Sequence, residues 1–168
     1  NIEFKADEKK ASKLTCFIFD VADSLKGAVI AAFFVFCLFF RVIGVEGTSM
    51  MPTLHNGDWV AVSGISMNIQ KGVPIVKRVI AKGGDTVDID FALGDVYVNG
   101  ERLDEPYIDE PTTLGYDVSF PLVVPEGKVF VMGDNRGDSL DSRSSKIGCI
   151  DERYILGKVM IRIYPAED

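Results

Sequence analysis

The sequence predicts a mainly β fold that follows one N-terminal transmembrane helix. Two observations carry this prediction. Residues 27–40 form an uncharged, largely apolar run, and the chain after residue 46 shows short alternating segments with no helical period. The length of 168 residues corresponds to about one domain. With 47% apolar and 26% charged residues, such a domain can bury a core.

The apolar run continues beyond Arg41 through residues 42–45. Counted over 25–45, it reaches the length of about 20 residues that a membrane-spanning helix needs. Arg41 lies near the end of this stretch, where a long basic side chain can extend to the membrane interface. A buried core helix and a secretory signal peptide are the alternatives, but no small-residue cleavage site follows the run. The sequence therefore predicts a transmembrane anchor over 25–45.

The flanking charges predict the orientation of this anchor. Four lysines precede it closely, at positions 9, 10, 13 and 26, and after Arg41 no lysine or arginine appears before Lys71. Because Lys and Arg are retained on the cytoplasmic side, residues 1–24 are expected in the cytoplasm and residues 46–168 outside the cell membrane. Several apolar residues of the first segment share one helical face, so it is expected to be a partly amphipathic helix that lies at the membrane or binds a partner.

The extracytoplasmic segment 46–168 is expected to be a β-rich domain. Asn99-Gly100 is a strong signal for a hairpin turn. Short strands separated by Gly, Pro and Asp clusters are expected over 57–63, 73–80, 85–90, 96–98, 128–132 and 154–164.

Composition excludes several classes of function. The net charge of -7 argues against a nucleic-acid partner, whose phosphates require a basic surface. The three cysteines lack metal-ligand spacing, and His55 is the only histidine, so we expect no metal site and no cofactor. Only Cys149 lies in the predicted outer domain, so no disulfide can form within it.

Three segments contain residues of the kinds that catalytic sites use. Residues 47–54 place Ser49 before Pro52, which can be a simple turn or can present a nucleophile. Residues 75–80 place Lys77 among apolar neighbours, which can be an edge lysine or a desolvated base. Residues 132–143 are dense in polar side chains, which can form a solvated turn or a hydrogen-bonded support for a site.

A serine and a lysine together suggest acyl-transfer chemistry. A serine hydroxyl needs a base before it attacks an acyl carbon, and a neutral lysine can be that base. A lysine between Ile75 and Val79 on a half-buried strand would lose solvation, which lowers its pKa.

At these segments the sequence resembles the bacterial type I signal peptidases, serine–lysine membrane peptidases of the S26 family. The resemblance implies a strand-rich catalytic domain with an apolar face on the bilayer. It implies Ser49 as nucleophile and Lys77 as general base, with Met50 near the substrate pocket. The residues implied to support Lys77 and to hold the loop near the site are Ser139, Asp141 and Arg143.

The resemblance also implies the substrates and partners. The expected substrates are exported pre-proteins with small residues at -1 and -3 of the cleavage site, bound as an extended strand. Membrane lipid and the secretion machinery are the other expected partners. Two departures are visible: Gly47 replaces a serine that supplies an oxyanion donor in some members, and the segment 63–74 is short. A catalytically inactive membrane-tethered binding module, or a Ser–Lys peptidase with one dedicated substrate, is therefore the alternative.

Overall fold

The computed structural model describes residues 2–64 and 74–164, with the backbone alone at 2–14, 16, 38 and 164. The chain divides into two compact units, Asn1–Phe40 and Arg41–Asp168, and each is described by itself.

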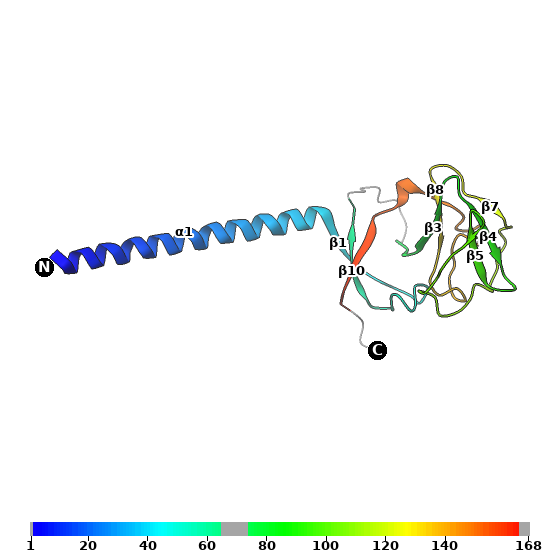
Figure 1. Cartoon of the computed structure of the whole chain (residues 1–168), viewed down its shortest axis with the longest axis horizontal. Coiled ribbons are helices and arrows are strands. Elements are labelled where there is room, and N and C mark those ends of the chain that lie inside the picture. Colours follow the sequence, from blue (N-terminus) through cyan, green and yellow to red (C-terminus); the bar gives the residue numbers. More distant parts are fainter. Residues whose placement is uncertain (1, 65–73, 165–168) are drawn as a thin grey trace. The chain divides into compact units, whose positions relative to one another are not determined.

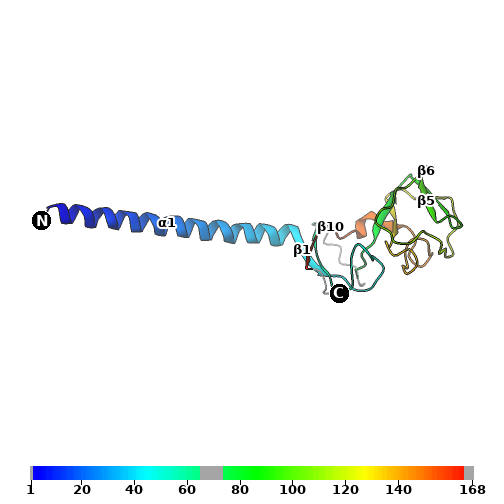
Figure 2. The ribbon, with the colours of Figure 1, turned by 60° about the horizontal axis from the view of Figure 1, so that its bottom comes forward.

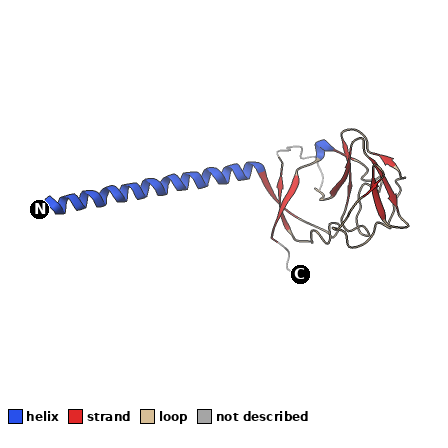
Figure 3. Ribbon diagram, in the orientation of Figure 1, coloured by secondary structure: helices blue, strands red, loops and turns tan. Residues whose placement is uncertain are grey.

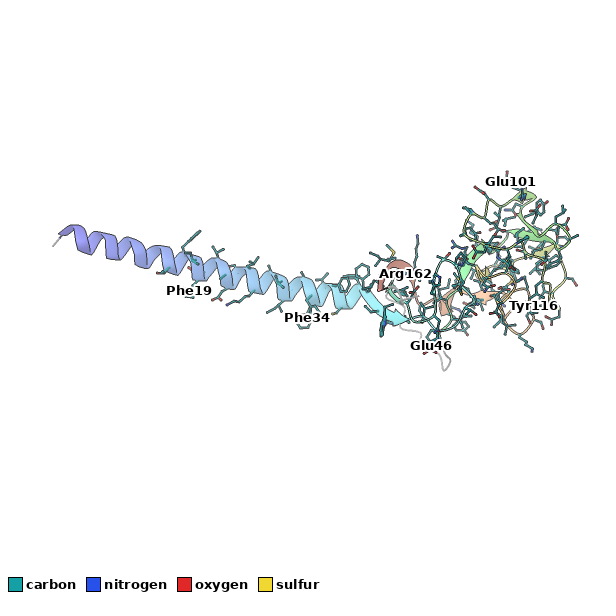
Figure 4. All side chains as sticks on the ribbon, turned by 90° about the horizontal axis from the view of Figure 1, so that it is seen from below. Phe19, Phe34, Glu46, Glu101, Tyr116 and Arg162 are labelled. Carbon is teal, nitrogen blue, oxygen red and sulfur yellow. The ribbon has the colours of Figure 1, made fainter. Side chains whose placement is uncertain are left out.

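The first unit is the helix α1, Ile2–Phe39, which Figure 1 shows as an uninterrupted coil. Its described apolar side chains are exposed along its length. Figure 4 shows Phe19 and Phe34 projecting away from the ribbon, and their exposed fractions are 69% and 63%. Within the described residues, no helix combines the length and the apolarity needed to cross a membrane.

The helix ends earlier than the anchor predicted over 25–45. Residues Phe40–Gly44 form the strand β1 instead, so the expectation of helix over these residues is wrong. Val42 and Ile43 are β-branched and favour a strand. Strand β1 also finds hydrogen-bond partners for its backbone in β2. An apolar run by itself does not distinguish a buried strand from a helix, which explains the error.

The second unit is mainly β, as predicted, and Figure 3 shows its short strands joined by long loops. One sheet has the order β1-β2-β10, in which β2 is Trp59–Ser63 and β10 is Lys158–Tyr164. Strand β10 runs antiparallel to β2 and pairs Lys158 with Ser63. A buried cluster is associated with this sheet and the following turn: Val45, Met50, Leu54, Val60 and Val62.

A second sheet has the order β3-β8-β9. Its strands are β3 (Arg78–Lys82), β8 (Lys128–Met132) and β9 (Ile150–Asp151). Strand β3 runs antiparallel to β8, with Arg78 opposite Met132.

The third sheet has the order β6-β5-β4-β7, and Figure 2 shows β5 beside β6. Its strands are β4 (Thr86–Asp90), β5 (Asp95–Val98), β6 (Glu101–Arg102) and β7 (Leu122–Val123). The second and third sheets enclose the larger core cluster: Ala81, Val87, Ile89, Val96, Val124, Phe130 and Met132.

The predicted hairpin at Asn99-Gly100 is confirmed. Strands β5 and β6 pair antiparallel across it, with Val98 opposite Glu101. The φ angles of Asn99 and Gly100 are 54° and 82°. Positive φ at both central residues is what a type I′ turn requires, and asparagine and glycine tolerate it best.

Two predicted strands are shorter than expected. Strand β3 begins at Arg78, so the strand predicted over 73–80 does not contain Lys77. The strand predicted over 154–164 begins only at Lys158, because Glu152–Tyr154 form the 3₁₀ helix η1. The short segment singled out over 63–74 lies almost entirely at 65–73, outside the described residues.

Candidate active site

Ser49 lies in a tight turn between β1 and β2, which we call the nucleophile turn (residues 47–54). Gly47 has φ 92°, a conformation that a side chain would strain, and its N–H donates to Asn56 Oδ1 at 2.9 Å. The backbone N–H of Leu54 donates to the Met50 carbonyl at 2.9 Å. Ser49 is half-buried, and within the described part of the chain its backbone N–H has no hydrogen-bond partner.

Met50 anchors the nucleophile turn. Its side chain is only 6% exposed and belongs to the buried cluster with Val45, Leu54 and Val60. A buried neighbour restricts the rotation of the turn, so the backbone of Ser49 is held by packing as well as by hydrogen bonds.

Lys77 lies immediately before β3 and is half-buried. Its Nζ donates a hydrogen bond to Ser139 Oγ at 3.0 Å. Its neighbours Ile75 and Val79 are 56% and 53% exposed. Because β3 begins only at Arg78, the expectation that Lys77 lies on a half-buried strand face is wrong.

The electrostatic surroundings of Lys77 come from residues 134–143. Burial lowers its pKa below the ordinary lysine value. The carboxylates of Asp141, Asp138 and Asp134 oppose this shift by favouring the charged amine, and Arg143 adds to it. The net direction is downward, so the neutral amine is more accessible than in a free lysine.

We call residues 133–143 the support loop. Ser139 Oγ donates to Asp141 Oδ2 at 2.9 Å, and the Gly133 N–H donates to the same oxygen at 3.0 Å. Arg143 forms two hydrogen bonds to Asp141, from Nε to Oδ1 and from Nη2 to Oδ2, both at 2.9 Å. Asp141 and Arg143 have no exposed side-chain surface. Burial would raise the pKa of Asp141, but the hydrogen bonds and charge of Arg143, together with the hydrogen bonds from Gly133 and Ser139, lower it overall.

The remaining donors of Arg143 hold the loop backbone. Nη1 donates to the carbonyls of Leu114 at 2.7 Å and Arg136 at 3.0 Å. The Tyr116 hydroxyl donates to the Ser139 carbonyl at 3.0 Å. The loop is therefore fixed by buried and partly buried polar contacts, and the buried groups must stay paired to avoid a large desolvation cost.

Gly133 is the point where the nucleophile turn meets the support loop. A Cβ added there would overlap the Ser139 hydroxyl and the Ser49 carbonyl oxygen. The Asn135 N–H also donates to the Ser49 carbonyl, at 3.1 Å. The structure therefore brings the Ser49 backbone close to Ser139, the residue that contacts Lys77. No hydrogen bond joins Ser49 directly to Lys77 within the described ranges.

Several residues that secure the support loop were not assigned a role from the sequence. Arg78 forms a bidentate pair with Asp134, with both N–O distances 2.6 Å, and Thr53 Oγ1 donates to Asp134 at 2.5 Å. Arg136 Nη2 donates to Glu105 Oε1 at 2.6 Å, and both side chains are buried. All of these residues except Glu105 lie inside the segments 47–54, 75–80 and 132–143, but nothing in the sequence pattern indicated their partners.

His55 directly follows the nucleophile turn. The residue is half-buried, and its Nδ1 is buried without a hydrogen-bond partner among the described residues. Its backbone N–H donates to Asp58 Oδ2 at 2.8 Å, which orders the end of the nucleophile turn.

The geometry suits nucleophilic catalysis by amino-acid side chains. In the described residues, no group of three or more His, Cys, Asp or Glu side chains is placed to bind a metal ion. Lys77, whose pKa is lowered, contacts the Ser139 hydroxyl, and the Ser49 carbonyl accepts a hydrogen bond from Asn135 of the same loop.

The comparisons with known proteins agree on one family. Residues 18–164 match the family model described as signal peptidase, peptidase S26. The chain is 34% identical to signal peptidase I of Bacillus licheniformis over 180 aligned positions, covering 94% of this chain and 95% of the relative. It is 35% identical to signal peptidase I T of Bacillus subtilis (strain 168), covering 94% and 91%.

Among solved structures, the chain aligns with a signal peptidase I from Enterococcus faecalis at 27% identity. The alignment covers 71% of this chain and 100% of that one, with a TM-score of 0.42, which is too low to compare the two folds. The family assignment rests on the sequence matches, which extend over most of both chains. The chain belongs to the signal peptidase family, peptidase S26, and is a serine endopeptidase of that family.

Proposed function

We propose that the chain removes N-terminal signal peptides from exported pre-proteins, with Ser49 as nucleophile and Lys77 as general base. The observation that carries the proposal is the Lys77–Ser139 hydrogen bond beside a serine held in a rigid turn. A lysine can accept a proton only when it is neutral, and the lowered pKa of Lys77 increases that fraction near neutral pH.

The proposed reaction is acyl transfer in two steps. Neutral Lys77 takes the hydroxyl proton of Ser49 while Oγ attacks the scissile carbonyl carbon, which gives a tetrahedral oxyanion. The C–N bond then breaks, the amine of the mature protein takes the proton from Lys77, and an acyl-enzyme remains on Ser49. Water then attacks this ester and gives its proton to Lys77. The bond between Ser49 Oγ and the acyl carbon breaks, Ser49 Oγ takes the proton back from Lys77, and the signal peptide leaves with a free C-terminal carboxyl group.

The backbone N–H of Ser49 is one donor for the oxyanion, since no described residue accepts it. Gly47 has no hydroxyl to supply a second donor, and its own N–H is directed to Asn56. Ser139, Asp141 and Arg143 are proposed to orient Lys77 and to hold the support loop. We further propose that small residues at -1 and -3 of the substrate are preferred.

For location, we propose that the apolar part of α1 anchors the chain in the cell membrane, with residues 1–24 cytoplasmic and residues 46–168 outside. The support is the uncharged run 27–40 and the lysines before it. Membrane lipid and the secretion machinery are the proposed partners. The test is carbonate extraction of membranes, with protease added from outside. Release of the protein by carbonate, or protection of the catalytic unit from protease, would contradict the proposal.

The catalytic proposal is tested by incubating the detergent-solubilised protein with a pre-protein. Ser49→Ala and Lys77→Ala are each expected to abolish cleavage. The two residues are proposed to act as one unit, so removing either one removes the activity of both. The exposed Ser119 and Lys146 offer matched controls, and Ser119→Ala and Lys146→Ala are expected to cleave at the wild-type rate.

Three outcomes would contradict the proposal in different ways. Normal cleavage by folded Ser49→Ala or Lys77→Ala would refute the dyad. Binding of the pre-protein without cleavage by the wild type would instead support a tethered binding module. Cleavage of one pre-protein among many with small -1 and -3 residues would support an enzyme with a dedicated substrate.

A further inference from the structure

The nucleophile turn is attached to the support loop by a side-chain contact that the catalytic proposal does not use. Thr48 Oγ1 donates a hydrogen bond to Asp138 Oδ2 at 2.6 Å. The neighbouring Asn135 adds two bonds, from its N–H to the Ser49 carbonyl at 3.1 Å and from Nδ2 to the Thr48 carbonyl at 3.3 Å. Because Thr48 directly precedes Ser49, a shift of Thr48 displaces the nucleophile.

Asp138 occupies the equivalent place on the other side of the site. It directly precedes Ser139, which accepts the hydrogen bond from Lys77. Its own N–H donates to the Asn135 carbonyl at 3.2 Å and to Asn135 Oδ1 at 3.1 Å, so its backbone is held in a defined turn. The hydrogen bond between Thr48 and Asp138 therefore joins the residue before Ser49 to the residue before Ser139.

The carboxylate of Asp138 also faces Lys77 electrostatically. The charged groups that act on Lys77 are the carboxylates of Asp134, Asp138 and Asp141 and the guanidinium of Arg143. The three carboxylates favour the charged amine, whereas Arg143 and burial favour the neutral one. Removing the charge of Asp138 removes one of the three groups that keep Lys77 protonated.

We propose that Asp138 is a positioning residue that holds Ser49 in place against the support loop through the hydroxyl of Thr48. The proposal rests on the proposed function, in which Ser49 is the nucleophile. The same carboxylate has a second, separable effect, because its charge influences the pH at which Lys77 becomes neutral.

Substitutions separate the hydrogen bond from the charge. Thr48→Val removes the hydrogen bond and keeps the charge, whereas Asp138→Asn removes the charge and keeps an acceptor oxygen. Asp138→Ala removes both, and Thr48→Ser retains the hydroxyl. Thr113→Val and Asp109→Asn change an exposed threonine and an exposed aspartate of another loop and are the matched controls.

The measurement is kcat and KM of the detergent-solubilised full chain on a signal-peptide substrate as a function of pH. We expect Thr48→Val to lower kcat on the order of tenfold with an unchanged pH profile. Thr48→Ser should restore kcat. Asp138→Asn should keep the plateau of kcat and move the acid limb of the pH profile to lower pH. Asp138→Ala should show both the lower kcat of Thr48→Val and the shifted acid limb of Asp138→Asn.

A double variant tests whether the two residues act together. If Thr48 and Asp138 form one contact, Thr48→Val combined with Asp138→Ala should have the same plateau of kcat as Asp138→Ala alone. Wild-type kcat in Thr48→Val, or losses that simply multiply, would overturn the proposal. A loss of kcat that only follows the unfolded fraction of the sample would overturn it as well.

Failure of the catalytic proposal would be recognised separately. If folded Lys77→Ala or Ser49→Ala still cleaved the substrate, the dyad itself would be refuted, whatever the Thr48 variants did. If both were inactive and Thr48→Val had wild-type kcat, the dyad would stand and only the positioning role of Asp138 would be refuted.

Discussion

Lys77 donates a hydrogen bond to Ser139 Oγ at 3.0 Å, while the Ser139 hydroxyl donates its proton to Asp141 at 2.9 Å. The single hydroxyl proton is thereby directed to the carboxylate, and the oxygen faces Lys77 as an acceptor. An acceptor on one side of the Lys77 amine restricts the orientation of the amine. That orientation is thus set by residues far from Lys77 in the sequence.

Lys77→Arg is expected to be inactive although it keeps a cation at the site. A guanidinium remains protonated at any working pH and cannot accept the proton of Ser49. The measurement is pre-protein cleavage at several pH values, with Lys82→Arg, at an exposed position of β3, as the active control. Detectable turnover by Lys77→Arg would remove Lys77 from the role of base.

The acid limb of the pH–rate profile should have its midpoint below the ordinary lysine pKa of about 10.4. Burial lowers the pKa of Lys77, and the active form is the neutral amine, so the rate rises with pH through that lowered value. His55→Ala is expected to keep the shape of this profile and most of the rate. Loss of all activity in folded His55→Ala, together with turnover in Lys77→Ala, would assign the limb to the histidine.

Gly133→Ala is expected to reduce cleavage strongly. The added Cβ would overlap the Ser139 hydroxyl and the Ser49 carbonyl, so one of the two must shift. Gly137→Ala in the same loop is the control, because its Cβ would meet Glu110 Oε2 at an ordinary contact distance of 3.5 Å. Steady-state rates of both variants test the expectation, and equal rates would contradict it.

Asp141→Ala is expected to lower the free energy of unfolding by about 3–5 kcal/mol, because it leaves the buried Arg143 without its partner. The folded pKa of Asp141 is lowered, so its contribution is present above the ordinary carboxyl pKa and is lost as pH falls through the folded value. The difference in the free energy of unfolding between wild type and Asp141→Ala, measured with urea, should therefore be smaller at acidic pH than at neutral pH. Asp109→Ala is the exposed control, and equal stability of Asp141→Ala and wild type would refute the structural role.

Tyr107→Phe should make the protein less sensitive to alkali. Burial, and secondarily the hydrogen bond to Glu105 at 2.9 Å, raise the pKa of Tyr107 to about 12. Because the pKa of Tyr107 is raised in the folded protein, its contribution to the free energy of unfolding is complete below the ordinary tyrosine pKa of about 10. This contribution is lost as the pH rises through the pKa of the folded protein. Unfolding midpoints between pH of about 9 and 12 should fall more steeply in wild type than in Tyr107→Phe. Tyr154→Phe, at an exposed position, should behave as wild type.

The sequence by itself determined features that depend on local physics. Asn99-Gly100 specified a hairpin because few other residue pairs adopt positive φ twice, and the structure contains that turn. The short apolar segment 128–132 between Pro, Gly and Asp residues predicted β8 with its observed bounds. Ser49 and Lys77 were singled out because a desolvated lysine can activate a serine, and Ser139 was singled out through the family resemblance.

Only the tertiary structure decided which residues meet. Phe40–Gly44 became a strand because β2 offers it a partner, which an apolar pattern does not reveal. Lys77 contacts Ser139 of the support loop, whereas its neighbours Ile75 and Val79 are exposed. Thr48 and Asp138 are 90 positions apart and meet only because the nucleophile turn packs on the support loop. Local periodicity describes which face of an element is apolar, but the partner of a buried charge or hydroxyl is chosen by the packing of distant segments.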